Sequence, residues 1–599
     1  MRLNRCLSIA LACSMLPFTA AWSRTFTVKN LNYEVISETD HTVRVKSPTE
    51  PEGIAITNIL TIPATVTDPS GAGVYSVVEI GEGAFRGRTI SYMIIEPGEG
   101  TLRFAEYAMA SVDLRGLTVS RDFTAPANHE PFYGLTSLVD LALGNGITRV
   151  PAFAFMKSGI RYVRIPASVE SIGYAAFEQT DLLRVDFDSD SRLKYIFGEA
   201  FQDCKKLKNP VYLPEGLVKI GEFAFQYSGI TSISLPASLQ EIGNCAFRGC
   251  SDLSAMSPAA GSRYRYSNGL LMSADRKTVY QAFDIDRFLT VPEGVTTIAA
   301  FAFSGLNVKS VTLPSTLTTI EENAFDPNWN MSTLNLPEGL VSIGESGLGR
   351  CTALWTLQLP ESLQSIGPKC FWGLGVSSIN IPASLKVIPE KAFELSRLKS
   401  IEIPETVVAV GSRAFERCTS LESVKFGSKW ETVRKIEPAT FIGCTALKEV
   451  TLPHFLSSIG DEAFYGCREL KSILLPAALK TIGEHAFDSI PDFAEVSSCA
   501  PEPPLLPMNA FSNKVYRKAT LKVPEGYAQI YRSAPVWELF ANIVESPDLS
   551  GIDDISADLP EDAVTVYRLD GVLVYRGKRS AMPVLAPGVY IVNGRKIRF

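Results

Sequence analysis

The sequence has little of what catalytic and metal sites require. It contains only 4 histidines among 599 residues. It has no C-x-x-C pair, H-E-x-x-H motif, phosphate-cradling G-x-x-x-x-G-K-[ST] loop or nucleophile elbow. We therefore expect no catalytic residue, no metal and no cofactor, and we expect that the chain is not an enzyme. His454 and His485 fall at variable positions of the repeat described below and are expected to face solvent.

The sequence also lacks an excess of basic residues and long apolar runs. The net charge of −7 provides no basic footprint, which argues against a nucleic-acid partner. Beyond the N-terminus no apolar run reaches the ~20 residues that span a bilayer, so we expect no transmembrane span. The 46% hydrophobic and 20% charged residues describe a folded protein. At 599 residues it should form several domains or an elongated repeat.

The N-terminus reads "MRLNRCLSIALACSMLPFTAAWSR". Arg2 and Arg5 precede a short apolar run, and 21–23 (Ala-Trp-Ser) place small residues three and one positions before a cut. This layout predicts a signal peptide over residues 1–23 and a secreted or outer cell-surface protein. A lipoprotein, with Cys13 after Ala-Leu-Ala, is the alternative.

One phrase recurs along most of the chain, as in "LPASLQEIGNCAFRGC" and "LPAALKTIGEHAFDSI". Its Phe residues are spaced by 22 to 26 residues, apart from one jump of 56, with Leu348 replacing one of them. They are Phe155, Phe177, Phe201, Phe225, Phe247, Phe303, Phe325, Phe371, Phe393, Phe415, Phe441, Phe464, Phe487 and Phe511. A fixed period of this length indicates a repeat architecture.

Each part of the phrase has a physical meaning. In "LKSIEIP", Ile401 and Ile403 should point inward on a short strand, which Pro404 ends because proline cannot donate to a sheet. Gly411 should allow the tight bend that follows, and Phe415 should fill the interior. The neighbouring Glu416 is expected at the surface. Since one unit cannot close its own core, the units must stack into a solenoid.

The same residues resemble the BspA-like leucine-rich repeats of bacterial surface proteins, as in "LPEGLVKIGEFAF" and "IPASLKVIPEKAF". The resemblance implies a right-handed leucine-rich repeat solenoid, with a parallel sheet on its concave face and short turns or helical pieces on its convex face. It also implies a role as an adhesin for host matrix or other microbes, and it does not imply a catalytic activity.

Departures from the repeat predict the domain boundaries. "RYRYSNGLLMSADRKTVYQAF" indicates strands with hairpin turns, projecting from the solenoid as an insertion. Tyr527, Ile530 and Tyr531 follow Pro524 at helical spacing and predict a capping helix. The expected domains are a β-rich cap over 24–80, a solenoid over 81–511 with a β insertion over 251–300, a second cap over 512–545 and an acidic linker over 546–562.

The last segment, 563–599, is a different β-rich module with two hairpin signals. In "LDGVLVYRG" and "APGVYIVNGRKI" it resembles the C-terminal sorting domain of proteins exported through the type IX secretion system. A small β domain of unknown purpose is the alternative.

Six cysteines occupy one repeat position, three residues after the Phe or Leu348, where Thr180 and Ser228 stand in other repeats. They are Cys204, Cys250, Cys351, Cys418, Cys444 and Cys467. A position that accepts Cys, Thr or Ser is a small buried site, so we expect reduced thiols that pack as small hydrophobic groups. Asp186, Asp188 and Asp190 form the start of a calcium loop, but Gly and Glu are missing at its sixth and twelfth positions. A solvated turn is therefore favoured over a calcium site.

The remaining candidate for function is the surface. The outward strand positions on the concave face are the candidate ligand-binding residues, and they are Ser232, Ser234, Ser310, Thr312, Ser378, Asn380, Ser400 and Glu402. Short polar side chains on a rigid sheet suit a protein or glycan ligand on a host or microbial surface. An inert structural spacer that displays something else is the alternative, and Tyr264 and Tyr266 of the insertion are a rival site. We expect a monomer.

Overall fold

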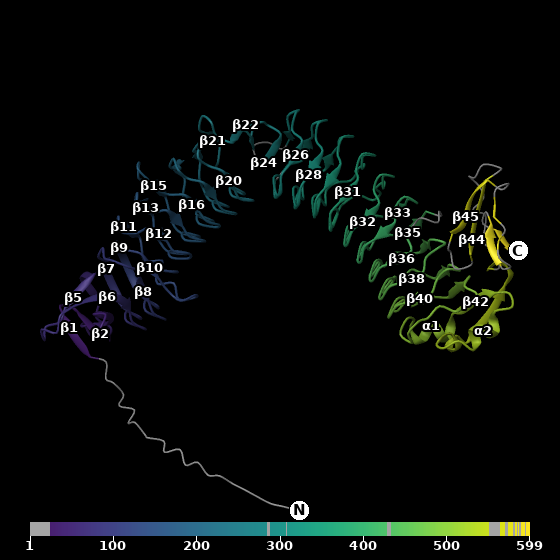
Figure 1. Cartoon of the computed structure of the whole chain (residues 1–599), viewed down its shortest axis with the longest axis horizontal. Helices are drawn as coiled ribbons and strands as arrows, with labels where there is room; N and C mark the ends of the chain where they lie inside the picture. The colour runs from purple at the N-terminus through teal and green to yellow at the C-terminus, as the bar shows by residue number, and fades with distance from the viewer. Residues whose placement is uncertain are drawn as a thin grey trace, which may run out of the picture. The chain divides into compact units, whose positions relative to one another are not determined.

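The computed structural model describes residues 24–283, 288–306, 308–427, 433–549, 563–568, 573–578, 582–583, 585, 589–592 and 595–598. The predicted signal peptide (1–23) and most of the predicted linker (550–562) lie outside these residues. The chain forms two compact units, Met1–Ile220 (unit 1) and Gly221–Phe599 (unit 2). Figure 1 labels the strands and helices of both.

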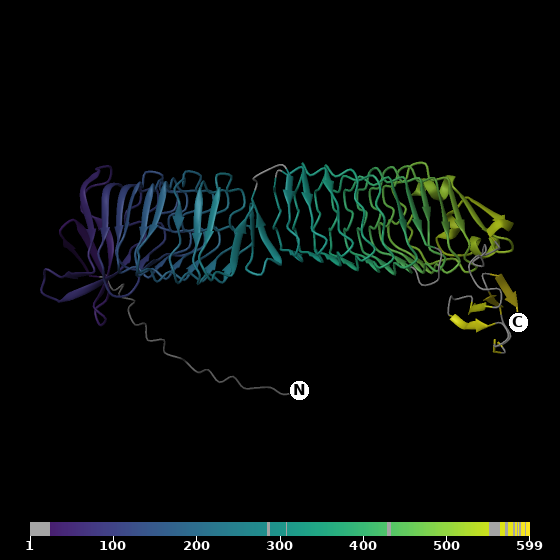
Figure 2. The same cartoon turned by 90° about the horizontal axis from the view of Figure 1, so that it is seen from above.

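Each unit is a stack of coils, which confirms the solenoid fold, and most coils contribute two strands. One strand comes from the S-I-x-L-P segment of the repeat, and we call the sheets of these strands the LP sheets. The other strand ends at the Ile before Gly, and we call its sheets the IG sheets. The strands of adjacent coils pair in parallel, for example Ser400 with Ser423 and Ala409 with Val387. Figure 2 shows these strands stacked side by side within each unit.

Unit 1 contains one LP sheet and the start of an IG series. The LP strands are β4 (Ile56–Ile62), β7 (Thr89–Ile95), β9 (Asp113–Val119), β11 (Asp140–Leu143), β13 (Tyr162–Ile165), β15 (Arg184–Phe187) and, in the next coil, β17 (Val211–Tyr212). The IG strands are β6 (Val74–Ile80), β8 (Leu102–Phe104), β10 (Phe123–Thr124), β12 (Arg149–Val150), β14 (Ser171–Ile172), β16 (Tyr195–Ile196) and β18 (Lys219–Ile220).

In unit 2 the LP strands fall into several separate sheets. They are β19 (Ser232–Leu235), β21 (Ala255–Pro258), β25 (Phe288–Thr290), β27 (Ser310–Thr312), β29 (Thr333–Leu334), β33 (Ser400–Ile403), β35 (Ser423–Phe426), β37 (Glu449–Thr451), β39 (Ser472–Leu475) and β41 (Glu495–Ser498). The IG strands are β20 (Glu241–Ile242), β26 (Thr297–Ile298), β28 (Thr319–Ile320), β30 (Ser342–Ile343), β31 (Ser365–Ile366), β32 (Val387–Ile388), β34 (Ala409–Val410), β36 (Lys435–Ile436), β38 (Ser458–Ile459) and β40 (Thr481–Ile482).

The segment that carries the Phe is a run of turns. In the coil of Phe415, Arg413 and Arg417 have positive φ values of 57° and 54°. The N–H groups of Arg413, Phe415 and Arg417 all donate to carbonyls of the next coil, at 2.8 to 3.2 Å. The N–H groups between them close turns within the coil. Every second N–H group of the turns therefore bonds to the next coil, which adds a third set of inter-coil hydrogen bonds to those of the LP and IG sheets. These bonds offset the cost of the left-handed backbone at non-glycine residues.

Gly411 is required for a different reason from the one we predicted. It has no positive φ, so it does not supply a special bend. A Cβ at this position would lie 2.5 Å from the backbone nitrogen of Glu390 in the preceding coil. The Gly411 N–H donates to the carbonyl of Ile388 at 2.8 Å. The repeated glycine is therefore a contact point where two coils approach too closely for any side chain.

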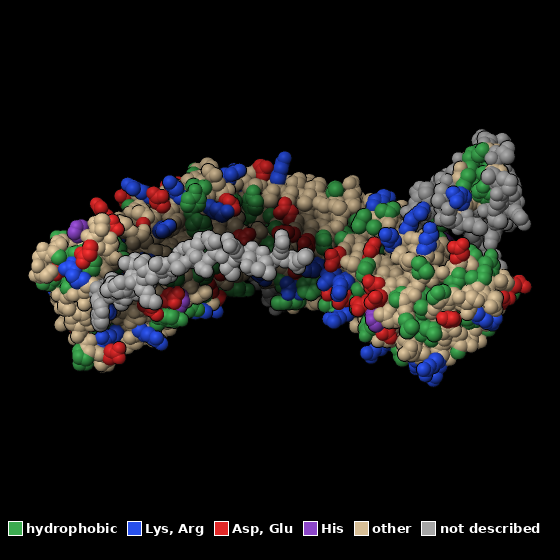
Figure 3. All heavy atoms as spheres, turned by 60° about the horizontal axis from the view of Figure 1, so that its bottom comes forward, with side chains coloured by type: hydrophobic (Ala, Val, Ile, Leu, Met, Phe, Trp, Pro, Cys, Tyr) green, Lys and Arg blue, Asp and Glu red, His purple; other side chains and the backbone are tan. Residues whose placement is uncertain are grey.

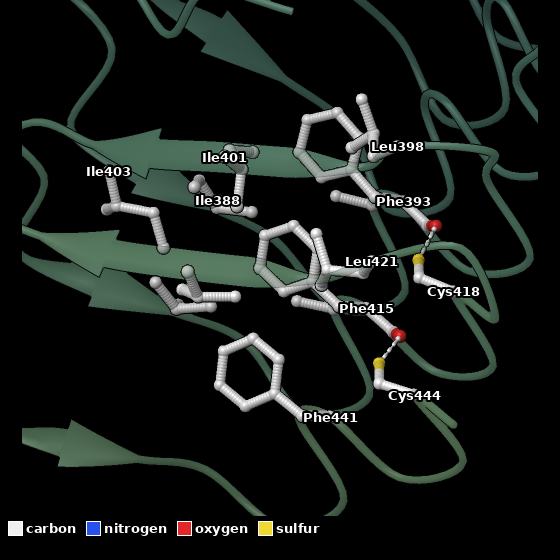
Figure 4. Packing of buried hydrophobic residues seen from close by; sticks show 14 of the residues in the cluster. Ile388, Phe393, Leu398, Ile401, Ile403, Phe415, Cys418, Leu421, Phe441 and Cys444 are labelled. Carbon is white, nitrogen blue, oxygen red and sulfur yellow. Dashed lines mark hydrogen bonds between the residues drawn. The ribbon is translucent and has the colours of Figure 1, made fainter. Parts of the chain in front are cut away.

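The repeated Phe residues are buried in the core, as predicted, and successive rings stack on each other in runs within each unit. Phe393, Phe415 and Phe441 are fully buried, and their ring centroids are 5.3 Å apart in both successive pairs, nearly parallel (Figure 4). The surface prediction for Glu416 is wrong, because this side chain is buried and accepts a hydrogen bond from Arg413 at 3.1 Å. Glu416 lies within the run of turns, where strand alternation does not apply.

The N-terminal cap is strand-rich, as predicted. β1 (Thr25–Val28), β2 (Leu31–Ser37) and β3 (Thr42–Pro48) are antiparallel, and β3 then pairs in parallel with β6. β5 (Thr65–Thr67) pairs antiparallel with the first three residues of β6, Val74 to Ser76. Since β4 and β6 are already the two strands of a coil, the solenoid begins inside the predicted cap, before residue 81.

The predicted insertion contains strands and hairpins, but it does not project from the solenoid. β22 (Tyr264–Ser267), β23 (Leu270–Ser273) and β24 (Thr278–Ala282) are antiparallel. β24 then pairs in parallel with β26, so the three strands extend the IG sheet of unit 2. Sequence alternation identified the strands, but it does not specify which neighbour the last strand joins.

The C-terminal cap closes the LP sheet formed by β39 and β41. It consists of α1 (Asn513–Lys518), β42 (Thr520–Pro524), α2 (Ala528–Arg532), the 3-10 turn η1 (Trp537–Leu539), β43 (Asn542–Ser546) and the 3-10 turn η2 (Pro547–Leu549). α2 confirms the predicted helix, and its Tyr531 is fully buried, with a hydroxyl that donates to the carbonyl of Ala500 at 2.8 Å. The last module is an antiparallel sheet of β44 (Ala563–Arg568), β45 (Leu573–Lys578), β46 (Val589–Val592) and β47 (Arg595–Arg598).

Candidate binding surface

The outward side chains of the LP strands form what we call the LP face. Parallel pairing in register places equivalent side chains of adjacent coils next to each other, as Tyr162 beside Arg184 in unit 1 and Glu402 beside Lys425 in unit 2. Inward residues such as Ile401 are buried. The fold therefore presents rows of side chains that a partner can contact together.

The structure places six of the eight candidate residues on LP strands, in three different sheets. Ser232 and Ser234 are half-buried on β19, and Ser310 is half-buried and Thr312 exposed on β27, whereas Ser400 and Glu402 are exposed on β33. The candidates thus form three separate groups and not one continuous row.

The other two candidates, Ser378 and Asn380, do not lie on a strand. The side-chain oxygen of Asn380 accepts a hydrogen bond from the N–H of Leu359 at 2.8 Å, and its amide nitrogen donates to the carbonyl of Leu359 at 2.7 Å. The Asn380 amide therefore occupies the place where strand-to-strand hydrogen bonds would form. Asn380 is half-buried and its amide is engaged with the preceding coil, while Ser378 is exposed.

Charged side chains of the LP face pair across coils. In unit 2, Lys425 lies 3.3 Å from Glu402, and both side chains are about 70% exposed. In unit 1, Asp186 accepts hydrogen bonds from the Tyr162 hydroxyl at 3.1 Å and from Arg184 at 2.8 Å. Exposed pairs of this kind contribute little to stability.

Two of the three acidic side chains of the calcium-loop candidate, Asp186 and Asp188, are used in such pairs. Asp188 accepts hydrogen bonds from the Arg164 guanidinium and from the N–H of Ala167. Throughout the described residues, no group of three or more His, Cys, Asp and Glu side chains could hold a metal ion. The solvated turn that we favoured is consistent with these contacts.

Unit 1 also contains a groove that sequence analysis missed. It has a volume of about 470 Å³ and lies where four successive coils enter their LP strands. Its lining residues are Thr89, Ile90, Ser91, Asp113, Arg115, Ser137, Val139 and Arg161. These residues fall just before or at the start of the regular strand alternation, so the repeat pattern gave no signal. Two arginines in equivalent positions of different coils were the available clue.

The cysteine position of the repeat holds hydrogen-bond donors. The thiols of Cys418 and Cys444 donate to the carbonyls of Phe393 and Phe415 in the preceding coils, at 3.0 and 3.1 Å (Figure 4). Asn328 occupies the same position and donates to the Phe303 carbonyl at 2.8 Å. Cys, Thr, Ser and Asn can each donate a hydrogen bond at this position, but the buried Leu374 and Ile490 fill it in other coils, so a donor is not required in every coil. All nine described cysteines are free thiols, and eight of them are buried.

The two histidines of the repeats differ in their surroundings. His454 is exposed, as predicted. His485 is half-buried, with Nδ1 3.1 Å from Asp488 and Nε2 3.1 Å from the Asn509 amide. His485 therefore joins the ends of two turns in adjacent coils, whereas solvent exposure was expected.

The insertion is a weaker candidate than its tyrosines suggested. Tyr264 is buried, and its hydroxyl donates to the carbonyl of Gln240 at 3.1 Å. Tyr266 packs edge-on against Phe283. Tyr264 thus anchors the insertion to the solenoid, whereas Tyr266 packs within the insertion. Tyr280, which is exposed, contacts Tyr264 and is the tyrosine of this segment that a ligand could reach.

The surface charge of each unit is mixed. On the face drawn in Figure 3, acidic and basic side chains are interspersed over both units. No helix in the described part of the chain has the length and apolar character to cross a membrane.

The chain matches a family model described as "BspA type Leucine rich repeat region (6 copies)". The matched residues, 74–184, 127–254, 277–397 and 386–518, make up more than half of the chain. A search of curated proteins found no match.

Several solved structures are similar. One is a leucine-rich repeat protein from Eubacterium ventriosum, with 19% identity over 78% of this chain and 95% of that chain and a TM-score of 0.39. Another is the pneumococcal vaccine antigen PcpA, with 17% identity over 88% of this chain and 99% of that chain and a TM-score of 0.33. A leucine-rich cell surface protein from Faecalibacterium prausnitzii is 22% identical over 71% and 94% of the two chains, with a TM-score of 0.33.

Proposed function

Because the chain belongs to the BspA-type leucine-rich repeat family, we propose that it is an exported protein, secreted or held at the outer cell surface, that binds a protein or glycan on a host or microbial surface. We also propose that it has no catalytic activity. Its binding surface is the LP face. The observation that carries the proposal is the register of the LP strands, which repeats outward side chains from coil to coil at a fixed spacing.

The composition of the LP face in unit 2 supports recognition of a large, weakly charged surface. The exposed positions Thr312, Ser400 and Ser472 are short polar residues on strands held by a buried core. Such side chains lose little conformational freedom on binding, so a partner that covers many coils gains from many small contacts. No single residue is expected to dominate.

A binding screen with matched variants tests this proposal. The purified chain is screened against extracellular matrix proteins and a panel of glycans. For any ligand found, the triple variant Thr312→Lys, Ser400→Lys, Ser472→Lys is compared with Ser365→Lys, Val387→Lys, Ala409→Lys, which adds the same charge at exposed positions of the IG strands. Loss of binding in the first variant alone supports the LP face.

Two results would contradict the proposal. Equal binding of both variants would move the site away from the LP face of unit 2, and Tyr280→Ala then tests the insertion. Absence of any ligand in the screen would favour the alternative of a structural spacer. Export is tested separately, by sequencing the N-terminus of the protein recovered outside the cell, which should begin after residue 23.

A further inference from the structure

The groove of unit 1 is built by four consecutive coils. Thr89 on β7 pairs in register with Asp113 on β9, and the backbone N–H of Val139 donates to the carbonyl of Arg115 at 3.0 Å. The N–H of Arg161 reaches the carbonyl of Val139 at 3.4 Å. The side chains that line the groove are therefore fixed by backbone pairing on both sides.

Two arginines in the groove have no partner. Arg115 and Arg161 are exposed, and neither side chain forms an ion pair or a hydrogen bond with the part of the chain that the structure describes. Other arginines of the same unit are paired, such as Arg164 with Asp188 and Arg184 with Asp186. Two unpaired guanidinium groups on one groove form a receptor for a carboxylate, which arginine binds with two parallel hydrogen bonds.

Tyr92 follows these groove residues on β7. It comes directly after Ser91, and it pairs in register with Gly116, the residue after Arg115. A Cβ on Gly116 would be 2.2 Å from the Tyr92 ring, and the Tyr92 hydroxyl is 3.1 Å from the Thr118 hydroxyl. The ring is therefore held against the backbone of β9, and it is half-exposed. An aromatic ring fixed in this way can stack on the C–H face of a sugar ring.

The other lining groups suit hydroxyls better than a second negative charge. Ser91 and Ser137 can donate or accept hydrogen bonds, and Asp113 can only accept them when ionised. A ligand with carboxylates along its whole length would place one of them near Asp113. A ligand with one carboxylate among several hydroxyls satisfies all of these groups.

We propose that this groove binds an acidic saccharide, with its carboxylate between Arg115 and Arg161, its ring on Tyr92 and its hydroxyls on Asp113 and the two serines. The site lies in unit 1 and shares no residue with the LP face of unit 2, so either proposal can fail alone. The ligands of the unit 1 groove are therefore sugars that carry a uronate or sialate group.

The test measures binding of the purified chain to an array of saccharides that carry uronate or sialate and to their neutral counterparts. We expect binding to members of the acidic set and not to the neutral ones. Arg115→Ala and Arg161→Ala should each weaken the affinity by about tenfold or more, in line with the loss of a charged hydrogen-bonded pair. Arg184→Ala is the matched control, because it removes an equal charge from the same unit at a paired arginine.

Two further measurements keep the result interpretable. Tyr92→Phe removes the hydroxyl but keeps the ring and should retain binding, whereas Tyr92→Ala should lose about tenfold. Thermal unfolding should be unchanged in the arginine variants, since both side chains are exposed. The proposal is overturned if no acidic saccharide binds, if Arg184→Ala weakens binding as much as Arg115→Ala, or if tetraglutamate binds as tightly as the sugars.

Discussion

The coil of β13 in unit 1 carries Tyr162 and Arg164 at the outward positions where the coil of β33 in unit 2 carries Ser400 and Glu402. The interiors of the same two regions are alike, with Phe rings stacked at 5.5 Å between Phe177 and Phe201 and at 5.3 Å between Phe393 and Phe415. The stacking of coils determines the interior, whereas the outward positions can vary without affecting it. Differences in binding between the units should therefore come from outward residues.

The strongest test of this comparison removes one ring from each interior. Phe177→Ala and Phe415→Ala should each lower the free energy of unfolding by about 3–5 kcal/mol, because each leaves a cavity in a run of stacked rings. Chemical denaturation of both variants measures this. Glu402→Ala is the control, since its side chain is 71% exposed. If the two Phe variants differ by more than the error of the fits, the two interiors are not equivalent.

The hydrogen bond at the cysteine position should add to stability beyond packing. Cys418→Ser keeps a group that can donate to the Phe393 carbonyl, whereas Cys418→Val removes this donor and should cost about 0.5–1.5 kcal/mol, because the Ser396 N–H still donates to that carbonyl. In unit 1, Thr180→Val removes one of the two side-chain donors to the Phe177 carbonyl, the other being the Cys204 thiol, and should cost a similar amount. Denaturation midpoints of the three variants provide the comparison. A valine variant as stable as the parent would mean that shape alone governs the position.

Alkaline pH should destabilise both units through their thiols. Burial raises the pKa of Cys204 in unit 1 to about 12 and that of Cys250 in unit 2 to about 11. Above pH ~9 the unfolded chain loses these protons while the native chain keeps them, so stability falls as pH rises. Each thiol should cost about 1.4 kcal/mol at pH 10.

Cys204→Ser is the control for this pH effect, because serine does not titrate there and retains a donor. Its unfolding free energy should fall less between pH 8 and pH 10 than that of the parent, and an equal decrease would contradict the assignment. A thiol count in the denatured, unreduced protein should also give nine free thiols from Cys204 to Cys499. A lower count would mean that some of them pair.

The smallest effects on stability are expected on the LP faces. Arg164→Ala in unit 1 and Lys425→Ala in unit 2 each remove one exposed ion pair and should change the free energy of unfolding by about 1 kcal/mol or less. Thermal unfolding of the two variants tests this. A larger loss of unfolding free energy for Arg164→Ala would show that the charged side chains on the LP face of unit 1 stabilise the fold.

The repeat predicted most of the fold, because the spacing of Phe415 and its equivalents reports directly on buried positions. Contacts between coils were harder to predict. The roles of Gly411 and Asn380 depend on the backbone of the preceding coil, at Glu390 and Leu359, which no single repeat contains. The direction of Glu416 follows from alternating turn geometry that the strand pattern does not describe.

The candidate site was only partly predictable for a related reason. The polar row of unit 2 follows the repeat, so Ser400 and Glu402 could be assigned from alternation. The groove of unit 1 combines irregular positions from four coils, and its arginines are recognisable as a site only when Tyr92 is seen over Gly116. The spacing of the repeat predicts the positions that recur in every coil, whereas the groove is formed by residues that differ from coil to coil.

The inter-coil hydrogen bonds of the turn segment have a consequence for how such a chain can change in length. In the coil of Phe393, the Phe N–H donates to Ala414 of the next coil, and in the coil of Phe415 it donates to Thr440, at 2.8 and 2.9 Å. Each coil therefore offers its neighbour the same connection, whatever its outward residues are. Removal or duplication of one whole period, such as residues 393–414, would restore every connection at the junction. Recombination between repeats could thus lengthen or shorten the molecule in single coils, and so rearrange its binding rows without a new fold.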